Sequence, residues 1–139
     1  MAEHAIHTSL PPAILFGGHE NVVPLVRSFA ARSIPVYVLN ERWAEVGYCR
    51  HARRIRLPAS VPYPRSATEF LIGPASDVLR GSVLLAGLDG EIEIIAKHRE
   101  TLAEKFRLDL SNPVAQRMML DKLATYQAAR RAGVTIPRF

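Results

Sequence analysis

The sequence predicts an α/β protein whose open, mostly parallel, doubly wound sheet is followed by a C-terminal helical extension. Short apolar runs rich in β-branched residues alternate with stretches whose apolar residues recur at helical spacing. The chain has 139 residues, of which 48% are apolar and 22% charged, so it can form one packed domain. No apolar run approaches the ~20 residues that span a bilayer, so we expect no membrane partner.

The first forty residues predict a strand–helix–strand unit. Residues 13–16 are an apolar run that ends in a Gly17–Gly18 turn, which is typical of a buried strand. From Asn21 onward, apolar residues follow the spacing of one helix face until Pro35 ends the pattern. Residues 36–39 then form a second β-rich run. A parallel pair with a right-handed crossover is the expected arrangement.

The middle of the chain predicts two further strands and an interrupted helix. Residues 53–57 alternate between basic and apolar side chains, as in a strand with one buried face, and a proline-rich loop follows. Residues 66–79 have helical character that Gly73–Pro74 interrupts. Residues 82–88 form another buried strand that ends at Asp89–Gly90.

The last third predicts helices. Asp89 is a suitable N-cap for a helix that runs to about Lys105, and residues 107–110 resemble a short edge strand. Asn112–Pro113 is a favoured helix start. Gly133 suits the position just after a helix end, and Pro137 prevents continuation.

Charge is concentrated in one segment of the chain. The net charge is +5, and residues 50–65 hold five arginines and no acid, whereas the other 13 basic residues match the 13 acidic ones. Such a segment is either a phosphate or nucleic-acid patch or a solvated strand. The lack of interleaved aromatic residues favours the solvated strand, so no nucleic-acid partner is expected. Cys49 is the only cysteine, and residues 1–12 lack an apolar signal core, which together favour a cytoplasmic location.

Three loops lie where ligands bind in open α/β sheets, beyond the carboxyl ends of predicted strands. These loops are residues 17–21, 40–42 and 89–90. The first precedes a helix N-terminus, where backbone N–H groups can receive an anion, although its glycines equally serve a tight turn. The dinucleotide fingerprint and the P-loop are both absent. The residues predict no catalytic group and no metal ligand.

Residues 112–137 resemble a known family. Asp121–Lys122 is followed by about ten helical residues, then by Ala132-Gly133-Val134 and Pro137. This pattern resembles the opening of the ATP-grasp domain in ATP-dependent carboxylate–amine ligases and biotin-dependent carboxylases. Residues 14–40 look like the Rossmann-like pre-ATP-grasp domain that precedes it. The resemblance implies a pre-ATP-grasp domain over residues 1–110 and the truncated start of an ATP-grasp domain over residues 111–139.

The resemblance also implies a function. Enzymes of this family use ATP and Mg²⁺ to convert a carboxylate into an acyl phosphate, which an amine then attacks. Lys122 matches the lysine that approaches the nucleotide phosphates. Gly17, Gly18, His19 and Glu20 match a loop that borders the acceptor-substrate pocket in some relatives.

The same resemblance makes this chain an inactive N-terminal fragment, because the nucleotide cleft is built further along the family's chain. We therefore expect no cofactor in the fragment. Its expected partners are the remainder of its own chain and small carboxylate and amine substrates. A homodimer is another arrangement that covers the apolar positions of the tail.

Two other functions were weighed. A stand-alone flavodoxin-like binding or regulatory module fits the same fold, but the acidic cluster of a receiver domain is missing after the first strand. A small NAD-dependent enzyme is disfavoured because the third glycine of the fingerprint is absent.

Overall fold

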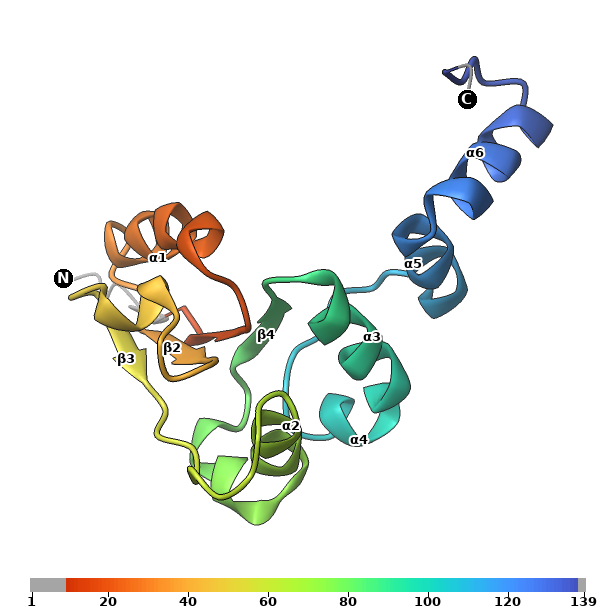
Figure 1. Cartoon of the computed structure of the whole chain (residues 1–139). Helices are drawn as coiled ribbons and strands as arrows, with labels where there is room; N and C mark the ends of the chain where they lie inside the picture. Colours follow the sequence, from red (N-terminus) through yellow and green to blue (C-terminus); the bar gives the residue numbers. More distant parts are fainter. Residues whose placement is uncertain (1–9, 138–139) are drawn as a thin grey trace, which may run out of the picture.

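The protein, described here by a computed structural model covering residues 10–137, contains a four-stranded parallel sheet (Figure 1). The strands are β1 (Ala13–Phe16), β2 (Val36–Leu39), β3 (Ala52–Arg54) and β4 (Val83–Ala86), in the order β3-β2-β1-β4. In the register, Ala13 is paired with both Val36 and Val83. The predicted open parallel sheet is confirmed.

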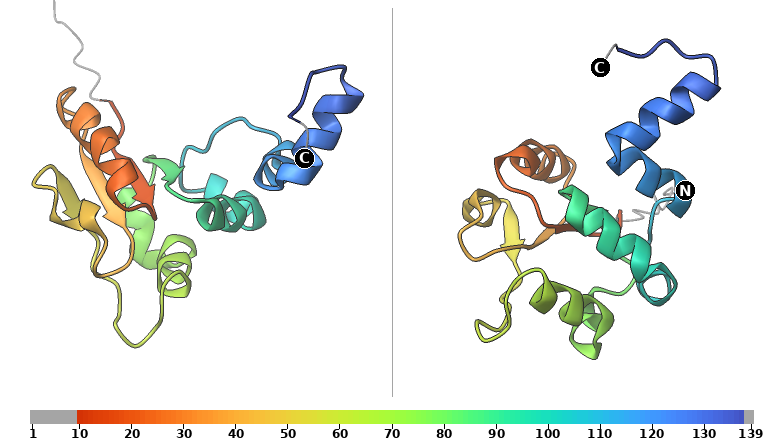
Figure 2. Two further views of the ribbon diagram at one scale, coloured as in Figure 1. Left: turned by 45° about the horizontal axis from the view of Figure 1, so that its top comes forward. Right: turned by 45° about the vertical axis from the view of Figure 1, so that its right-hand side comes forward.

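Helices connect the strands and cover both faces of the sheet (Figure 2). The α-helices are α1 (Val23–Ala30), α2 (Arg65–Ile72), α3 (Asp89–Lys97), α4 (Arg99–Ala103), α5 (Pro113–Leu120) and α6 (Lys122–Arg131). Three 3₁₀ segments lie between them: η1 (Glu20–Val22), η2 (Glu45–Tyr48) and η3 (Pro74–Leu79). None of the helices within residues 10–137 combines the length and apolar character needed to cross a membrane.

Alternation along β1 divides the core into two layers. Ile14 and Phe16 face α2, α3 and α4, where they pack with Leu71 and Leu102. The intervening Leu15 faces α1 and η2 and joins a second cluster. Because successive strand residues point to opposite faces, four consecutive apolar residues are buried only when both faces are covered. Each fully buried side chain of this size contributes about 1.5–3 kcal/mol, so cover on both faces stabilises β1 as an inner strand of the sheet.

Some predicted boundaries differ from the structure. The third strand covers residues 52–54, not 53–57, and the predicted edge strand at residues 107–110 is reduced to one bridge between Arg107 and Val83. The expected helix from Asp89 to Lys105 is broken at His98, whose backbone leaves the helical region. Asp89 is the first residue of α3 and not its N-cap, because the extended backbone of Leu88 places the helix start one residue earlier. Its carboxylate still lies at the positive end of the helix dipole.

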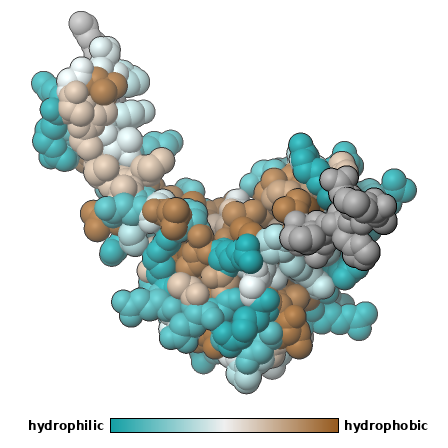
Figure 3. Space-filling model, turned by 180° about the vertical axis from the view of Figure 1, so that it is seen from behind, coloured by the Kyte–Doolittle hydropathy of each residue, from teal (hydrophilic) through white to brown (hydrophobic). Residues whose placement is uncertain are grey.

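The last two helices form a tail that projects from the sheet domain (Figure 1). The predicted helix start is confirmed, since the Asn112 side chain accepts hydrogen bonds from the backbone N–H groups of Val114 and Ala115. No described residue of α5 or α6 is buried. Hydrophobic surface lies at the base of the tail (Figure 3), and the exposed apolar side chains of this region are Leu110, Val114, Met119 and Leu123.

The expectation that the chain has no secretory signal depends largely on residues 1–9, which lie outside the described range.

Candidate functional site

The candidate site lies at the carboxyl ends of the strands, where four loops meet. These loops are residues 17–19 after β1, 40–44 after β2, 55–64 after β3 and 87–88 after β4. From β1 the sheet is extended in one direction by β2 and then β3. The next strand along the chain, β4, pairs with the opposite edge of β1, so the direction of strand addition reverses there. Ligands in open α/β sheets bind at such a change of direction.

The glycine loop after β1 is packed against the protein's own groups. Gly17 and Gly18 have φ angles of 75° and 94°, which side chains rarely adopt. A Cβ on Gly17 would lie 2.5 Å from Cδ of Glu91, and one on Gly18 would lie 2.6 Å from Cγ1 of Val22. A Cβ on Gly87 would lie 2.6 Å from the Gly17 carbonyl oxygen. The glycines therefore allow the loops after β1 and β4 to touch.

The remaining predicted acceptor-site residues lie beside this loop, where His19 is half-buried and Glu20 is exposed. The Nδ1 atom of His19 lies 3.2 Å from Oε2 of Glu45, and its backbone N–H donates to Asn21. Glu20 begins η1 with its side chain toward solvent. The structure brings Gly17, Gly18, His19 and Glu20 together at the carboxyl edge, and their substrate role stays a prediction.

Lys122 lies elsewhere in the molecule. It is the first residue of α6, directly after the Asp121 side chain that caps that helix, and it is exposed. Lys122 therefore lies apart from the carboxyl edge of the sheet, and its contact with nucleotide phosphates stays a prediction.

A cleft of about 620 Å³ opens between the loops that follow β2 and β3, and we call it the β2–β3 cleft. Its polar lining includes Asn40, Glu41, Arg42, Arg54, Arg56 and Tyr63. Ile55, Leu57 and Val61 give it an apolar wall. Both charge signs and an apolar surface are thus present in one concave site, as in many small-molecule sites.

Asn40, which lines this cleft, has a buried hydrogen-bond acceptor without a partner among the described residues. Its side-chain Nδ2 atom donates to the Gly18 carbonyl oxygen at 3.4 Å, and the residue is only 6% exposed. A carbonyl oxygen only accepts hydrogen bonds, so the amide nitrogen must be the atom that faces Gly18. The opposite atom, Oδ1, is buried and has no hydrogen-bond partner among the described residues.

The half-buried Tyr63, which lines the cleft, contacts the buried Glu91. The Tyr63 hydroxyl donates a short hydrogen bond to Oε1 of Glu91, a residue that is 4% exposed. Burial, followed by the hydrogen bond and the negative charge of Glu91, raises the pKa of the Tyr63 phenol far above its usual range. Oε2 of Glu91 is buried without a partner within residues 10–137. Tyr63 therefore stays neutral, and its hydroxyl oxygen can only accept further hydrogen bonds.

The arginines of the basic segment, residues 50–65, lie partly in the β2–β3 cleft and partly outside it. Arg54 donates to the Glu41 carbonyl oxygen at 2.6 Å and is half-buried, whereas Arg56 is exposed at the cleft. Arg53 lies outside the cleft, where its guanidinium lies 5.7 Å from the centre of the Tyr37 ring. The segment thus combines a solvated face, as its sequence favours, with arginines that line a cleft.

No protein-family model matches this sequence, and the search of curated proteins gives no match either. Over the part of the chain that the structure describes, no three His, Cys, Asp or Glu side chains gather as metal ligands. The site is therefore interpreted from its own chemistry.

Two residues of this site, Tyr63 and Glu91, were not predicted from the sequence. They are 28 positions apart and meet only because the proline-rich loop brings Tyr63 under the start of α3. One signal was present for Glu91, which lies four residues before the buried Ile95 and so shares its helix face. An acidic side chain on a buried helix face is rarely left without a partner, so this position predicts that Glu91 has a polar partner inside the fold.

Proposed function

We propose that this chain is the N-terminal, substrate-binding part of an ATP-dependent ligase that joins a carboxylate to an amine through an acyl phosphate. In that reaction a carboxylate oxygen attacks the γ-phosphorus of ATP, which releases ADP. The amine nitrogen then attacks the acyl carbon, and phosphate leaves as the amide forms. The carboxylate–amine chemistry, ATP, Mg²⁺ and a cytoplasmic location all belong to this proposal.

The observation that carries the proposal is the tail. A complete two-faced α/β domain is followed by two capped helices without a single buried residue among those described. The exposed apolar side chains of these helices, Val114, Met119 and Leu123, are typical of a surface that contacts a partner. A following nucleotide-binding domain supplies one, and it is the arrangement that the Asp121–Lys122 pattern predicts.

The carboxyl edge of the sheet supports the same proposal. The β2–β3 cleft offers acceptors, guanidinium groups and an apolar wall, which suit recognition of a small substrate. Its residues include no constellation of nucleophile and base, which fits a domain that binds and positions a substrate while another domain supplies the reactive nucleotide.

Steady-state kinetics on the intact enzyme test the proposal at Lys122. A charge-assisted contact to phosphate contributes about 1.5–3 kcal/mol, so Lys122→Ala should raise the KM for ATP about tenfold or more. Lys122→Arg should restore only part of this, because a planar guanidinium does not replace a compact ammonium. Lys97→Ala is the matched control, since Lys97 is another exposed helix lysine. Unchanged kinetics for Lys122→Ala would remove Lys122 from the nucleotide site.

A second candidate is a stand-alone flavodoxin-like binding module, and one observation favours it. The residues that line the β2–β3 cleft all belong to the sheet domain, between Asn40 and Ser66, and none comes from α5 or α6. Calorimetric titration of the 139-residue chain with Mg-ATP separates the two candidates. The ligase proposal predicts no tight binding, because the nucleotide cleft belongs to the following domain, whereas micromolar affinity would favour a complete module.

A further inference from the structure

We propose that a second cleft, lined by α1, η2 and the residues just after η2, binds the phosphate group of a small phosphate monoester through Arg27, Arg50 and His51. We call it the α1–η2 cleft. Its volume is about 730 Å³, and it shares no lining residue with the β2–β3 cleft. The inference goes beyond the proposed function, because it assigns a further ligand to a different part of the molecule.

The floor of the α1–η2 cleft belongs to the folded core. Val23 and Cys49 line the cleft and pack against the second hydrophobic cluster, which includes Leu15 of β1. Arg27 follows Val23 by about one helical turn, so the two residues share a face of α1. Arg50 follows Cys49 directly. The backbone that carries the two arginines is therefore held by packing on the core.

The basic side chains of this cleft keep most of their hydrogen-bond donors free. The Arg27 side chain makes no hydrogen bond or ion pair with any residue from 10 to 137. Nε of Arg50 donates to Nε2 of His51 at 3.1 Å, and its two terminal nitrogens have no partner in that range. Because Nε2 of His51 accepts this bond, Nδ1 is the ring nitrogen that can donate to a ligand. Two guanidinium groups and one imidazole thus offer donors within one cleft.

The charge of the lining favours an anion. Glu45 is the one acidic residue among the described residues of the lining, and Arg27 and Arg50 outnumber it. Its Oε2 atom lies 3.2 Å from Nδ1 of His19, outside the cleft lining, so this carboxylate already has a partner. The guanidinium groups are exposed, so water and salt weaken their attraction for an anion.

Three donor groups match a phosphate monoester better than a carboxylate. A phosphate monoester has three terminal oxygens and a charge of about −1.5 to −2 near pH 7. The paired terminal nitrogens of Arg50 can donate to two of these oxygens at once, which leaves the third for Arg27 or His51. The side chains of Tyr48 and Val23 also line the cleft, and the Tyr48 ring is largely exposed, so they can cover an apolar group attached to the phosphate.

The test uses two readouts on the 139-residue chain at constant ionic strength. Cys49 is the only cysteine and lies in the cleft, so a bound ligand should slow its alkylation by iodoacetamide. Phenyl phosphate should slow this alkylation to a saturating limit and shift the backbone amide signals of residues 23–27 and 45–51 of the ¹⁵N-labelled chain. Benzoate and inorganic phosphate should each bind at least about fivefold more weakly.

Each probe has an outcome that contradicts the proposal. Equal affinity for benzoate would overturn the preference for phosphate, and equal affinity for inorganic phosphate would overturn the contact with an organic group. If phenyl phosphate gives neither saturable protection of Cys49 nor saturable shifts of these amide signals, the cleft is not its binding site.

Substitutions of single arginines assign the phosphate contacts. Arg27→Gln and Arg50→Gln should each weaken phenyl phosphate about fivefold, and both side chains are exposed, so the variants should fold. Arg53→Gln is the matched control, because Arg53 is an exposed arginine of the same segment that lies outside this cleft. If Arg53→Gln weakens binding as much as Arg27→Gln, the attraction reflects general charge and the proposal fails. No nucleotide is used, so failure here leaves the ligase proposal to its own test at Lys122.

Discussion

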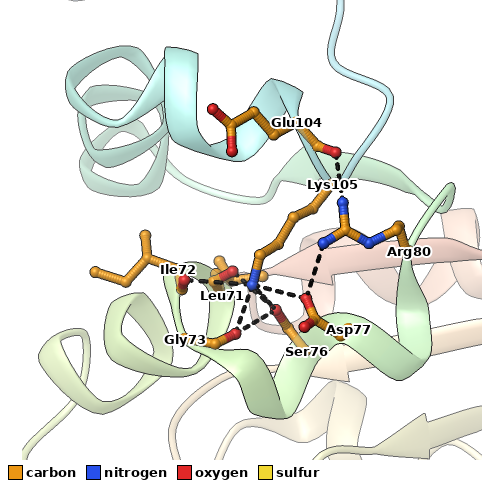
Figure 4. Close-up of polar contacts among 8 residues, drawn as sticks. All are labelled: Leu71, Ile72, Gly73, Ser76, Asp77, Arg80, Glu104 and Lys105. Carbon is orange, nitrogen blue, oxygen red and sulfur yellow. Dashed lines mark hydrogen bonds and ion pairs between the residues drawn. The ribbon is translucent and has the colours of Figure 1, made fainter.

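Replacement of Lys105 by methionine should destabilise the protein substantially, because this ammonium connects two segments at the amino end of β4 (Figure 4). Lys105 follows α4, and its side chain is only 10% exposed. Its Nζ atom lies 2.6 Å from the Gly73 carbonyl oxygen, 2.9 Å from Oδ1 of Asp77 and 3.3 Å from both the Ile72 carbonyl oxygen and the Ser76 hydroxyl. These acceptors lie at the end of α2 and the start of η3.

The expected loss of stability depends on which hydrogen bonds each acceptor keeps after the substitution. In Lys105→Met the aliphatic stem is largely kept. The Gly73 carbonyl oxygen still accepts from the Ser76 backbone N–H at 3.4 Å, and it shares the single hydroxyl hydrogen of Ser76 with the Leu71 carbonyl oxygen. The Ile72 carbonyl oxygen loses its Lys105 donor, and Asp77, which is half exposed, turns to water and to Arg80. Loss of the one strong charge-assisted bond to Gly73, together with incomplete satisfaction of Ile72, should cost about 2–3 kcal/mol.

Urea unfolding followed by circular dichroism measures this cost. The midpoint should fall while the denaturant slope stays unchanged, and the melting temperature should fall by about 4 °C per kcal/mol for a chain of this size. Lys97→Met is the matched control, since this exposed lysine of α3 makes no polar contact with the described residues and should lose less than about 0.5 kcal/mol. A Lys105→Met variant as stable as Lys97→Met would refute the reasoning.

Three further predictions concern the Tyr63–Glu91 pair, acid stability and the tail. Tyr63→Phe should lower the free energy of unfolding by about 2–4 kcal/mol, because it leaves the Glu91 carboxylate buried without its donor. The variant should show the same tyrosinate absorbance as the parent protein up to about pH 11, because the raised pKa keeps Tyr63 protonated there. A loss of that absorbance in the variant would contradict the raised pKa. The hydrogen bond from Lys105 lowers the pKa of the Asp77 carboxyl, so the stabilisation from this ion pair is present above the unfolded pKa and is lost as pH falls through the lower folded pKa. Asp77→Asn should therefore make the melting temperature fall less steeply below about pH 4. If the melting temperatures of the variant and the parent protein fall in parallel, the ion pair does not stabilise the fold. Hydrogen exchange in a dilute sample should be about a hundredfold faster in α6 than in β1, and equal protection would make the tail an integral part of the domain.

Local chemistry made much of the fold predictable from the sequence. The four buried residues of β1 and the Asn112 cap are recognisable because their causes, continuous apolar character and a short polar side chain before proline, lie within a few residues. The boundaries failed where tertiary packing decided them. The break at His98, for example, separates α3 from α4 while Ile95 and Leu102 join the same core, and no local signal marks it.

The candidate site was predictable in place but not in composition. The carboxyl edge and the loop that begins at Asn40 follow from the strand pattern, because parallel strands end together. The contact of Tyr63 with Glu91 does not follow, since a loop with several prolines can leave β3 in many directions before α2 begins. Nor does the unpaired Oδ1 atom of Asn40, which depends on the Gly18 carbonyl occupying the other end of the amide.

The proposal that this domain serves an ATP-dependent ligase is tested most directly by the products of the intact enzyme. The enzyme is incubated with Mg-ATP, a panel of amines and a panel of carboxylic acids, and nucleotides, phosphate and amide are quantified by chromatography and mass spectrometry. The account predicts ADP and phosphate in amounts equal to the amide, and no turnover when either the amines or the carboxylic acids are omitted. Formation of AMP and pyrophosphate, or amide formation without ATP, would contradict it.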